Sequence, residues 1–223
     1  PQTDSLAFIN LPSFPLSKPI QRVLREQEDL KLSRGNFATY PTVDKSGKIW
    51  LASGFNFDER TLQINEGGGF FRFDPQTQNI TSFWPNEVPR NMLSALLQDQ
   101  KGKFWLAIRD VGIYKFDPTT AQFTEIKPSG ALGAATLGRV NFMEVDPEGH
   151  IWMATSSELI EYNPKLKAFS YFNRSNGLFA SNLYELTQLS NGRLGLGTNN
   201  GFFVFDPVQM RKNGIPPELS FNE

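Results

Sequence analysis

The chain has no cysteine and only one histidine among its 223 residues. Without cysteine it forms no disulfide bridge and offers no thiolate to a metal or as a nucleophile. It also lacks an apolar run of the ~18 residues that a membrane-spanning helix needs, and its first residues, P-Q-T-D-S, show no basic stretch followed by an apolar one. We therefore expect a soluble segment without direct membrane insertion, with any signal or anchor outside it.

The chain also lacks an excess of charge of either sign, because 22 basic and 23 acidic residues leave a net charge of -1. Electrostatic binding to nucleic acid or to an anionic membrane needs excess basic charge, so we expect no nucleic-acid partner. Aromatic residues are plentiful, at 13% with 20 phenylalanines. Bulky aromatics suit strands that fill the space between neighbouring sheets, and this composition is typical of an all-β chain with many turns.

One pattern occurs four times: a turn with glycine, a short strand, a second turn, and an aromatic strand that ends at (Asp/Asn)-Pro. The copies open with D-K-S-G-K-I-W-L-A at Asp44, D-Q-K-G-K-F-W-L-A at Asp99, D-P-E-G-H-I-W-M-A at Asp146 and S-N-G-R-L-G-L-G at Ser190. The turn glycines recur about every 45 residues, the period of one four-stranded blade per repeat. The first interval is longer because an insertion, 56–66, lies between the second and third strands of the first repeat.

The second repeat shows the strands most clearly. They are predicted over residues 92–99, 103–108, 112–117 and 122–126. The second of these strands is apolar on both faces, so its sheet must lie between two others. Along the outermost strand apolar and polar residues alternate, as expected at the solvent-exposed edge of a blade. We predict an all-β fold, a β-propeller of four-stranded antiparallel blades, with about four full repeats that form either a whole propeller or part of a seven-bladed parent.

The Asp-x-x-Gly turns have a structural interpretation. The aspartate accepts backbone N–H groups and the glycine takes a positive φ, whereas calcium binding would need oxygen ligands where D-Q-K-G places a lysine. We therefore predict no metal site. Trp50, Trp105 and Trp152 are assigned to packing between blades, and Gly195 at the same position of the fourth repeat indicates thinner packing there. The single histidine, His150, lies in a turn and is predicted to be a solvated surface residue.

The boundaries of the repeats follow from the turns. We expect an N-terminal segment over 1–32, four repeats over 33–207 (about 33–85, 86–128, 129–174 and 175–207), and a C-terminal linker over 208–223. The fourth repeat lacks its own outer strand. A strand at 6–11 could complete that blade and close the ring, which would cover exposed sheet edges; alternatively, residues 217–222 begin a following domain. Residues 17–32 fit a helix, a strand or a loop.

The combined pattern D-x-x-G-x-(I/L)-W, then G-(I/L)-x-x-(F/Y)-D-P, then the connector N-G-L-F-A-S-N at 176–182, resembles the two-component regulator propeller repeat over about residues 33–207. The tail G-I-P-P-E-L-S-F at 214–221 is similar to the join between such propellers and a following immunoglobulin-like domain. The resemblance implies a periplasmic or extracellular sensor region of a bacterial hybrid histidine kinase or related receptor. It implies no enzyme activity and no cofactor in this segment, and many family members sense carbohydrate breakdown products.

The family's propellers have seven blades, more than the four repeats found here. The resemblance therefore implies that the chain is a fragment of a longer receptor, that it closes with fewer blades, or that it self-associates. An open part-propeller would expose apolar blade faces that drive association. Besides a ligand, the expected partners are a second copy of the chain or the remainder of the parent receptor.

The predicted ligand site is the propeller face from which the connectors between blades and the loops between second and third strands emerge. Asparagine, arginine, aspartate and an aromatic ring are the groups that hydrogen-bond to and stack on a sugar, so we expect a small-molecule or oligosaccharide ligand there. Ser156, Ser157, Asn56 and Asp58 lie in the same loops. The candidate residues are Phe55, Arg60, Arg90, Asn91, Arg109, Asp110, Arg139, Asn141, Asn182, Asn199 and Asn200.

Two other functions fit the same fold. A propeller lyase or lactonase needs a general base or metal ligands that converge on the channel. His150 is predicted to lie on the opposite face, which leaves only Asp58, Asp110 and Glu158 as candidate carboxylates, so no catalytic residue is assigned. A protein-interaction propeller would instead bind through exposed aromatic patches.

Overall fold

A computed structural model of the chain describes residues 38–53, 56–58, 63–65, 69–77, 79–89, 91–128, 137, 139–174, 178 and 182–213. The expected closing strand at 6–11, the tail at 214–221, and Phe55, Arg60 and Arg90 lie outside the described residues. The chain divides into two compact units, Pro1–Met92 and Leu93–Glu223.

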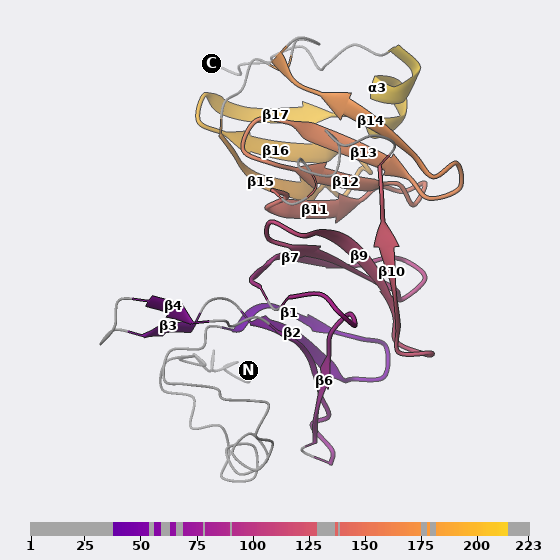
Figure 1. The fold of residues 1–223 in the computed structure, drawn as a ribbon. Coiled ribbons are helices and arrows are strands. Elements are labelled where there is room, and N and C mark those ends of the chain that lie inside the picture. Colours follow the sequence, from indigo (N-terminus) through magenta and orange to yellow (C-terminus); the bar gives the residue numbers. More distant parts are fainter. Residues whose placement is uncertain are drawn as a thin grey trace, which may run out of the picture. The chain divides into compact units, whose positions relative to one another are not determined.

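The first unit contains the first repeat. Its strands β1 (Ala38–Val43), β2 (Ile49–Ser53), β5 (Gly69–Phe73) and β6 (Ile80–Phe83) pair in the order β1-β2-β5-β6. A separate hairpin, β3 (Asn56–Asp58) with β4 (Gln63–Asn65), lies between β2 and β5 in the chain (Figure 1). The insertion therefore falls where the sequence predicted it, between the second and third strands of this repeat.

Among the described residues, the second unit contains three sheets and the helix α3 (Figure 1). Each sheet is antiparallel, with its strands paired in chain order. The strands are β7 (Leu93–Gln98), β8 (Phe104–Ile108), β9 (Gly112–Asp117) and β10 (Gln122–Ile126); β11 (Phe142–Val145), β12 (Ile151–Ala154), β13 (Leu159–Asn163) and β14 (Ala168–Phe172); and β15 (Leu183–Gln188), β16 (Leu194–Thr198) and β17 (Gly201–Phe205). The four strands predicted for the second repeat are confirmed to within one residue.

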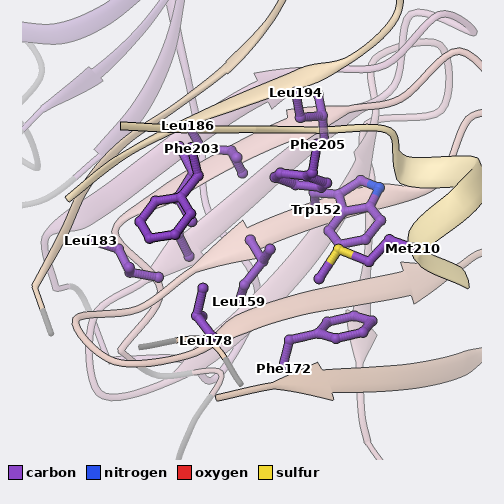
Figure 2. Close-up of a cluster of buried hydrophobic side chains, with 12 residues drawn as sticks. Trp152, Leu159, Phe172, Leu178, Leu183, Leu186, Leu194, Phe203, Phe205 and Met210 are labelled. Carbon is purple, nitrogen blue, oxygen red and sulfur yellow. The ribbon is translucent and has the colours of Figure 1, made fainter. Parts of the chain in front are cut away.

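The second and third sheets bury both faces of their second strands, as the sequence predicted for β8: every residue of β8 and β12 is buried. Adjacent residues of β12 point to different neighbours, because Met153 belongs to the cluster shared with the second repeat and Trp152 to the cluster shared with the fourth (Figure 2). The tryptophans fill these spaces. Trp105 lies 5.6 Å from Tyr162 of the next repeat, and Trp152 lies 5.2 Å from Phe205 of the next, measured between ring centroids.

The Asp-x-x-Gly turn is built around its aspartate. In the second repeat, Oδ1 of Asp99 accepts the backbone N–H groups of Lys101 and Lys103, both at 2.9 Å. Its other oxygen accepts the indole N–H of Trp105 at 3.0 Å, a bond that the sequence analysis did not predict. The same indole bond joins Asp44 to Trp50 at 2.7 Å and Asp146 to Trp152 at 3.0 Å. One carboxylate thus fixes both the turn and the residue that packs between sheets.

The fourth sheet differs from the others because it has three strands. After β17 the chain forms helix α3 (Pro207–Asn213), which the sequence analysis did not predict. Within the described ranges, no helix is long and apolar enough to cross a membrane. At Gly195 an added Cβ would lie 3.3 Å from the ring of Phe202, so the small residue lets that ring lie close over the strand.

Loss of the turn aspartate should destabilise the second unit. We expect Asp99→Ala to lower the free energy of unfolding by about 3 kcal/mol, because it removes three hydrogen bonds worth about 1 kcal/mol each. Chemical denaturation followed by circular dichroism measures this. Glu125→Ala, an exposed position on the outer strand β10, is the control and should change the free energy by less than about 0.5 kcal/mol. Equal effects of the two substitutions would show that the turn carboxylate contributes no more to the free energy of unfolding than an exposed side chain does.

Two further aspartates, from the aromatic-Asp-Pro tags, have lowered pKa values. The ammonium of Lys48 pairs with Asp74 and lowers its pKa to about 2. Likewise Lys103 pairs with Asp117 at 2.6 Å and, with hydrogen bonds from Thr119, holds the pKa of Asp117 well below its usual range. Both pairs join the residue before the second strand of a repeat to the C-terminal end of its third strand.

These pKa values predict acid sensitivity. A carboxylate whose folded pKa lies below the unfolded value of about 3.9 stabilises the fold above that pH. That stabilisation is lost as the pH falls through the folded pKa. We expect the urea midpoint to be level from about pH 7 to pH 4.5 and to fall between about pH 4 and pH 2. The double variant Lys48→Gln/Lys103→Gln should show a weaker fall, and an unchanged pH dependence in that variant would contradict this account.

Candidate functional site

The loops at one end of the third and fourth sheets are joined by backbone hydrogen bonds. Asn182, before β15, donates its N–H to the carbonyl of Ser156, after β12, at 2.7 Å and so joins the fourth repeat to the third. Within the third sheet, Asn141 donates its N–H to the carbonyl of Ala154 at 2.8 Å. Asn199 in turn donates to the carbonyl of Asn182 at 3.3 Å. The structure therefore brings three of the predicted residues to the same end of these two sheets, and Asn182, Asn199 and the neighbouring Asn200 are all exposed.

Backbone conformation explains the residue type at two of the predicted site positions. Asp110 has a φ of 57° and Asn182 a φ of 65°. This left-handed region disfavours most side chains, but asparagine and aspartate enter it more readily than others. Local geometry therefore selects these residue types at both positions, independently of any ligand.

The other predicted residues are more dispersed. Arg109 and Asp110 lie in the loop between β8 and β9, Arg139 precedes β11, and all three are exposed. Asn91 belongs to the first unit, and its Oδ1 accepts the N–H of Met92 at 2.7 Å. The structure thus gathers the asparagines of the third and fourth repeats into one group, which we call the asparagine end: Asn141, Asn182, Asn199 and Asn200.

Two polar residues that the sequence did not point to, Ser94 and Glu144, form hydrogen bonds between neighbouring sheets. Buried Ser94 on β7 donates its hydroxyl to the carbonyl of Val140 at 2.5 Å, which ties the second repeat to the third. Glu144 on β11 accepts the N–H of Gln188 on β15 at 3.2 Å. Burial raises the pKa of Glu144, and hydrogen bonds from Val145 and Gln188 offset this only in part. Neither residue belongs to the repeated motif, so no pattern in the sequence pointed to them.

The opposite end of the third sheet holds a cluster of ionic groups, and there the prediction for His150 is wrong. Instead of being solvated, His150 is 8% exposed and its Nδ1 lies 2.5 Å from Oε1 of Glu161. Arg211 from α3 reaches the same carboxylate at 3.2 Å and Asp146 at 2.5 Å. It also pairs with Glu148. We call these five residues the Arg211 cluster.

The local sequence of the third repeat explains this cluster. In the first two repeats the third strand places a basic residue over the tryptophan: Arg72 lies 5.7 Å from the ring centroid of Trp50, and Lys115 lies 5.1 Å from that of Trp105. The residue paired in register with Trp152 is instead Glu161. The third repeat therefore has an acidic group where the others have a basic one, and its cation comes from α3.

Asp146 and Arg211 stabilise each other's charge. Burial alone raises the pKa of Asp146, but hydrogen bonds from Trp152 and Arg211 outweigh it, so the pKa lies below its usual value. Burial likewise opposes the charge of Arg211, yet its carboxylate partners raise its pKa. This buried ion pair is therefore held in its charged form. Among the described residues, no group of three or more His, Asp or Glu side chains is placed to hold a metal ion.

An open groove of about 360 Å³ lies beside the Arg211 cluster. Asn163, Ser170, Tyr171 and Phe172 line it from the third sheet, and Met210 and Arg211 line it from α3. Of the carboxylates considered for catalysis, Glu158 accepts a hydrogen bond from Asn173 at 3.1 Å. Asp110 is exposed in its loop, and the side chain of Asp58 lies outside the described residues.

Comparison with known proteins identifies the fold. No family model matches the chain, and no curated protein sequence matches it. Among solved structures, it is similar to the extracellular domain of a putative hybrid two-component system from B. thetaiotaomicron, with 19% sequence identity and a TM-score of 0.57. The match covers 81% of this chain and 24% of that one, so the chain spans about a quarter of the length of its match.

Two other similar structures belong to different classes of protein. One is the WD40 β-propeller domain of Doa1, at 14% identity and a TM-score of 0.55, with 77% of this chain and 51% of that chain covered. The other is a luciferin-regenerating enzyme, at 10% identity and a TM-score of 0.53, covering 75% and 55%. Such likeness establishes the β-propeller fold, as the repeats predicted, and leaves the function to be argued from the site.

The left-handed backbone of Asn182 gives a direct test of its role. Asn182→Ala should lower the free energy of unfolding by about 1 kcal/mol, because alanine pays the left-handed cost that asparagine partly avoids. Asn182→Gly keeps the conformation without that cost and should be close to neutral. Urea denaturation of both variants measures the difference. An equal loss in the two variants would show that the asparagine side chain, and not the backbone, selects the residue.

Proposed function

We propose that the chain is a non-catalytic, ligand-sensing propeller segment of a bacterial signal-transduction receptor and a member of the two-component regulator propeller family. It acts outside the cytoplasm, in the periplasm or the extracellular space, and passes its signal to a histidine kinase or a similar output. The observation that carries this proposal is the four-fold repeat signature together with the structural likeness to an extracellular domain of a hybrid two-component system.

The proposed ligand is a carbohydrate or another small polar molecule bound at the asparagine end. An asparagine side chain both donates and accepts hydrogen bonds, which matches hydroxyl groups that do the same. The exposed amides of Asn182, Asn199 and Asn200 come from two loops that the backbone bond between Asn182 and Asn199 holds together. A ligand there would contact the fourth repeat, and the bond from Asn182 to the carbonyl of Ser156 ties this scaffold to the third repeat.

Signalling by such a site requires differential binding. A ligand shifts an equilibrium between two arrangements only as far as its affinity for them differs. A sugar that bridges the segment before β15, which contains Asn182, and the loop after β16 favours the arrangement in which those two segments are close. The remainder of the receptor, or a second copy of the chain, would cover the outer sheet faces that a part-propeller exposes.

The catalytic alternative has less support from the described residues. A lyase or lactonase needs a base free to reach the channel, yet the single histidine is buried against Glu161 at the far end of the sheet. A protein-interaction propeller would need a contiguous apolar patch. Tyr184 and Phe202 are exposed on the fourth sheet, and binding of a protein partner there is an outcome that a sugar-binding test separates.

The test starts with light scattering, followed by thermal shift and calorimetry with a panel of oligosaccharides. We expect one sugar class to stabilise the chain. Asn199→Ala and Asn200→Ala should each weaken binding about tenfold, the effect of losing a hydrogen bond worth about 1.4 kcal/mol. The matched control is Asn79→Ala, an exposed asparagine in the turn before β6, which should bind as the parent does.

Two results would count against this function. If Asn79→Ala weakens binding as much as Asn199→Ala does, the asparagine end is not the ligand site. If the chain forms a dimer or larger species and no sugar stabilises it, the sensing site is absent from this segment. Self-association through the exposed sheet faces is then the better description.

A further inference from the structure

Helix α3 occupies the place in the chain that an outer strand takes in the other repeats. It begins after Asp206, whose Oδ1 accepts the N–H groups of Val208 at 2.8 Å and Gln209 at 3.1 Å. Met210 is 4% exposed and belongs to the cluster of Trp152 and Phe172, so one apolar residue of the helix enters the core between the third and fourth repeats (Figure 2). The helix therefore rests on the third repeat and not only on its own.

The next residue, Arg211, provides the polar half of this contact. Its Nη1 reaches Asp146 at 2.5 Å and Glu161 at 3.2 Å, and its Nη2 pairs with Glu148. These partners lie on the turn before β12 and on β13. The Asp146 oxygen that Arg211 contacts is the one that accepts the indole N–H of Trp152. The helix thus engages the bond that fixes the third repeat's turn.

The third repeat in turn depends on α3, because its buried carboxylates need the charge of Arg211. The side chain of Asp146 is 0% exposed and that of Glu161 is 5% exposed. Buried carboxylates are costly unless a cation compensates them. Arg211 supplies the guanidinium that reaches both carboxylates, because the strand position that is basic in Arg72 and Lys115 is acidic here.

We propose that α3 is a latch: Arg211 and Met210 fasten the chain's exit from the fourth repeat onto the turn of the third, and the latch can open while the sheets stay folded. A helix of seven residues is too short to persist alone in water, so its folded state depends on these two anchors. Elements held by few buried contacts open locally at lower free energy than the core does. The latch requires no ligand and is independent of the proposed sensor function.

An open latch would free the end of α3 from the third repeat. While the latch is closed, the helix is held against the turn before β12 and against β13. When it opens, that constraint is lost and the buried carboxylates of Asp146 and Glu161 face water. The position of α3 is therefore tied to the packing of the third repeat against the fourth.

Hydrogen–deuterium exchange of the full chain, read by mass spectrometry on peptides covering 207–213, tests the latch. Arg211→Gln keeps most of the length of the side chain and removes its charge, and should speed exchange in α3 by at least about tenfold, since it breaks several charge-assisted hydrogen bonds. Arg211→Lys keeps the charge without the forked geometry and should give an intermediate rate. Gln209→Ala, an exposed position on the same helix, should exchange as the parent does.

Limited trypsin digestion gives a second readout, because cleavage after Lys212 requires α3 to unfold. We expect total cleavage within α3, after residue 211 or Lys212, to be faster in Arg211→Gln than in Gln209→Ala although Arg211→Gln keeps only the site after Lys212, while exchange in β12 and β13 stays at the parent's rate. If exchange rises equally in α3, β12 and β13, the helix belongs to the cooperative core and is no latch. If α3 in Arg211→Gln exchanges as slowly as in the parent, Arg211 does not hold it, and the proposal is also wrong.

Discussion

The carboxylate at the start of the Asp-x-x-Gly turn is the group on which the packing of the second and third repeats against the repeat that follows depends. One of its oxygens closes the turn through two backbone N–H groups, and the other fixes the indole of the tryptophan six residues later, as Asp99 does for Trp105. That tryptophan fills the space to the next sheet, where it meets the aromatic residue of the next tag: Tyr162 for Trp105 and Phe205 for Trp152. In these two repeats, local turn chemistry and packing between sheets therefore depend on the same carboxylate.

The third repeat keeps this arrangement and adds a partner to it. The exchange of a basic for an acidic residue opposite Trp152 leaves buried negative charge, which Arg211 compensates from a later part of the chain. Lysine likewise gives way to His150 at the position that pairs with the tag aspartate in the first two repeats, and the tag itself has Asn163. Several residues of one repeat thus differ together, as a rearranged ion-pair network requires.

The sequence was sufficient to predict the features that follow from a periodic pattern of residues along the chain. Alternation and turn spacing located the strands β7 to β10, the insertion before β5 and the missing outer strand of the fourth repeat. Tryptophan burial followed from the apolar pattern on both faces of β8. The fold class needed no more than this, because radial stacking is the arrangement that buries both faces of such sheets.

The features that the sequence did not predict depend on contacts between distant residues. His150 looked solvated because its turn is polar, whereas its burial results from the register that sets Glu161 beside it and from Arg211, which lies much later in the chain. The helix α3 is a similar case. The tags of the first and fourth repeats both use an aspartate to cap the following N–H groups, Asp74 for Gln76 and Asp206 for Val208. The same local motif leads to a turn in one and to a helix in the other.

The candidate site was predictable only in part for the same reason. Asparagine and arginine in loops identified a face, but the backbone bonds of Asn182 depend on how the segment before β15 meets the loop after β12, through Ser156, and the loop after β16, through Asn199. The left-handed φ of Asn182 also shows that a residue typical of ligand sites can be selected by local geometry. The face of a propeller that binds a ligand can therefore be predicted more safely than the individual binding residues, since loop composition reflects both turn chemistry and binding.

The third and fourth sheets are held together by a different kind of interaction at each of their two ends. Backbone hydrogen bonds join them at the asparagine end, after β12, and ion pairs join them through α3 at the other end, before β12. Any change in how these sheets pack must act on both ends, because β12 is fully buried between them. A ligand at the asparagine end that prefers one packing would then alter the geometry of the Arg211 cluster, and coupling requires only that its affinity for the two packings differ.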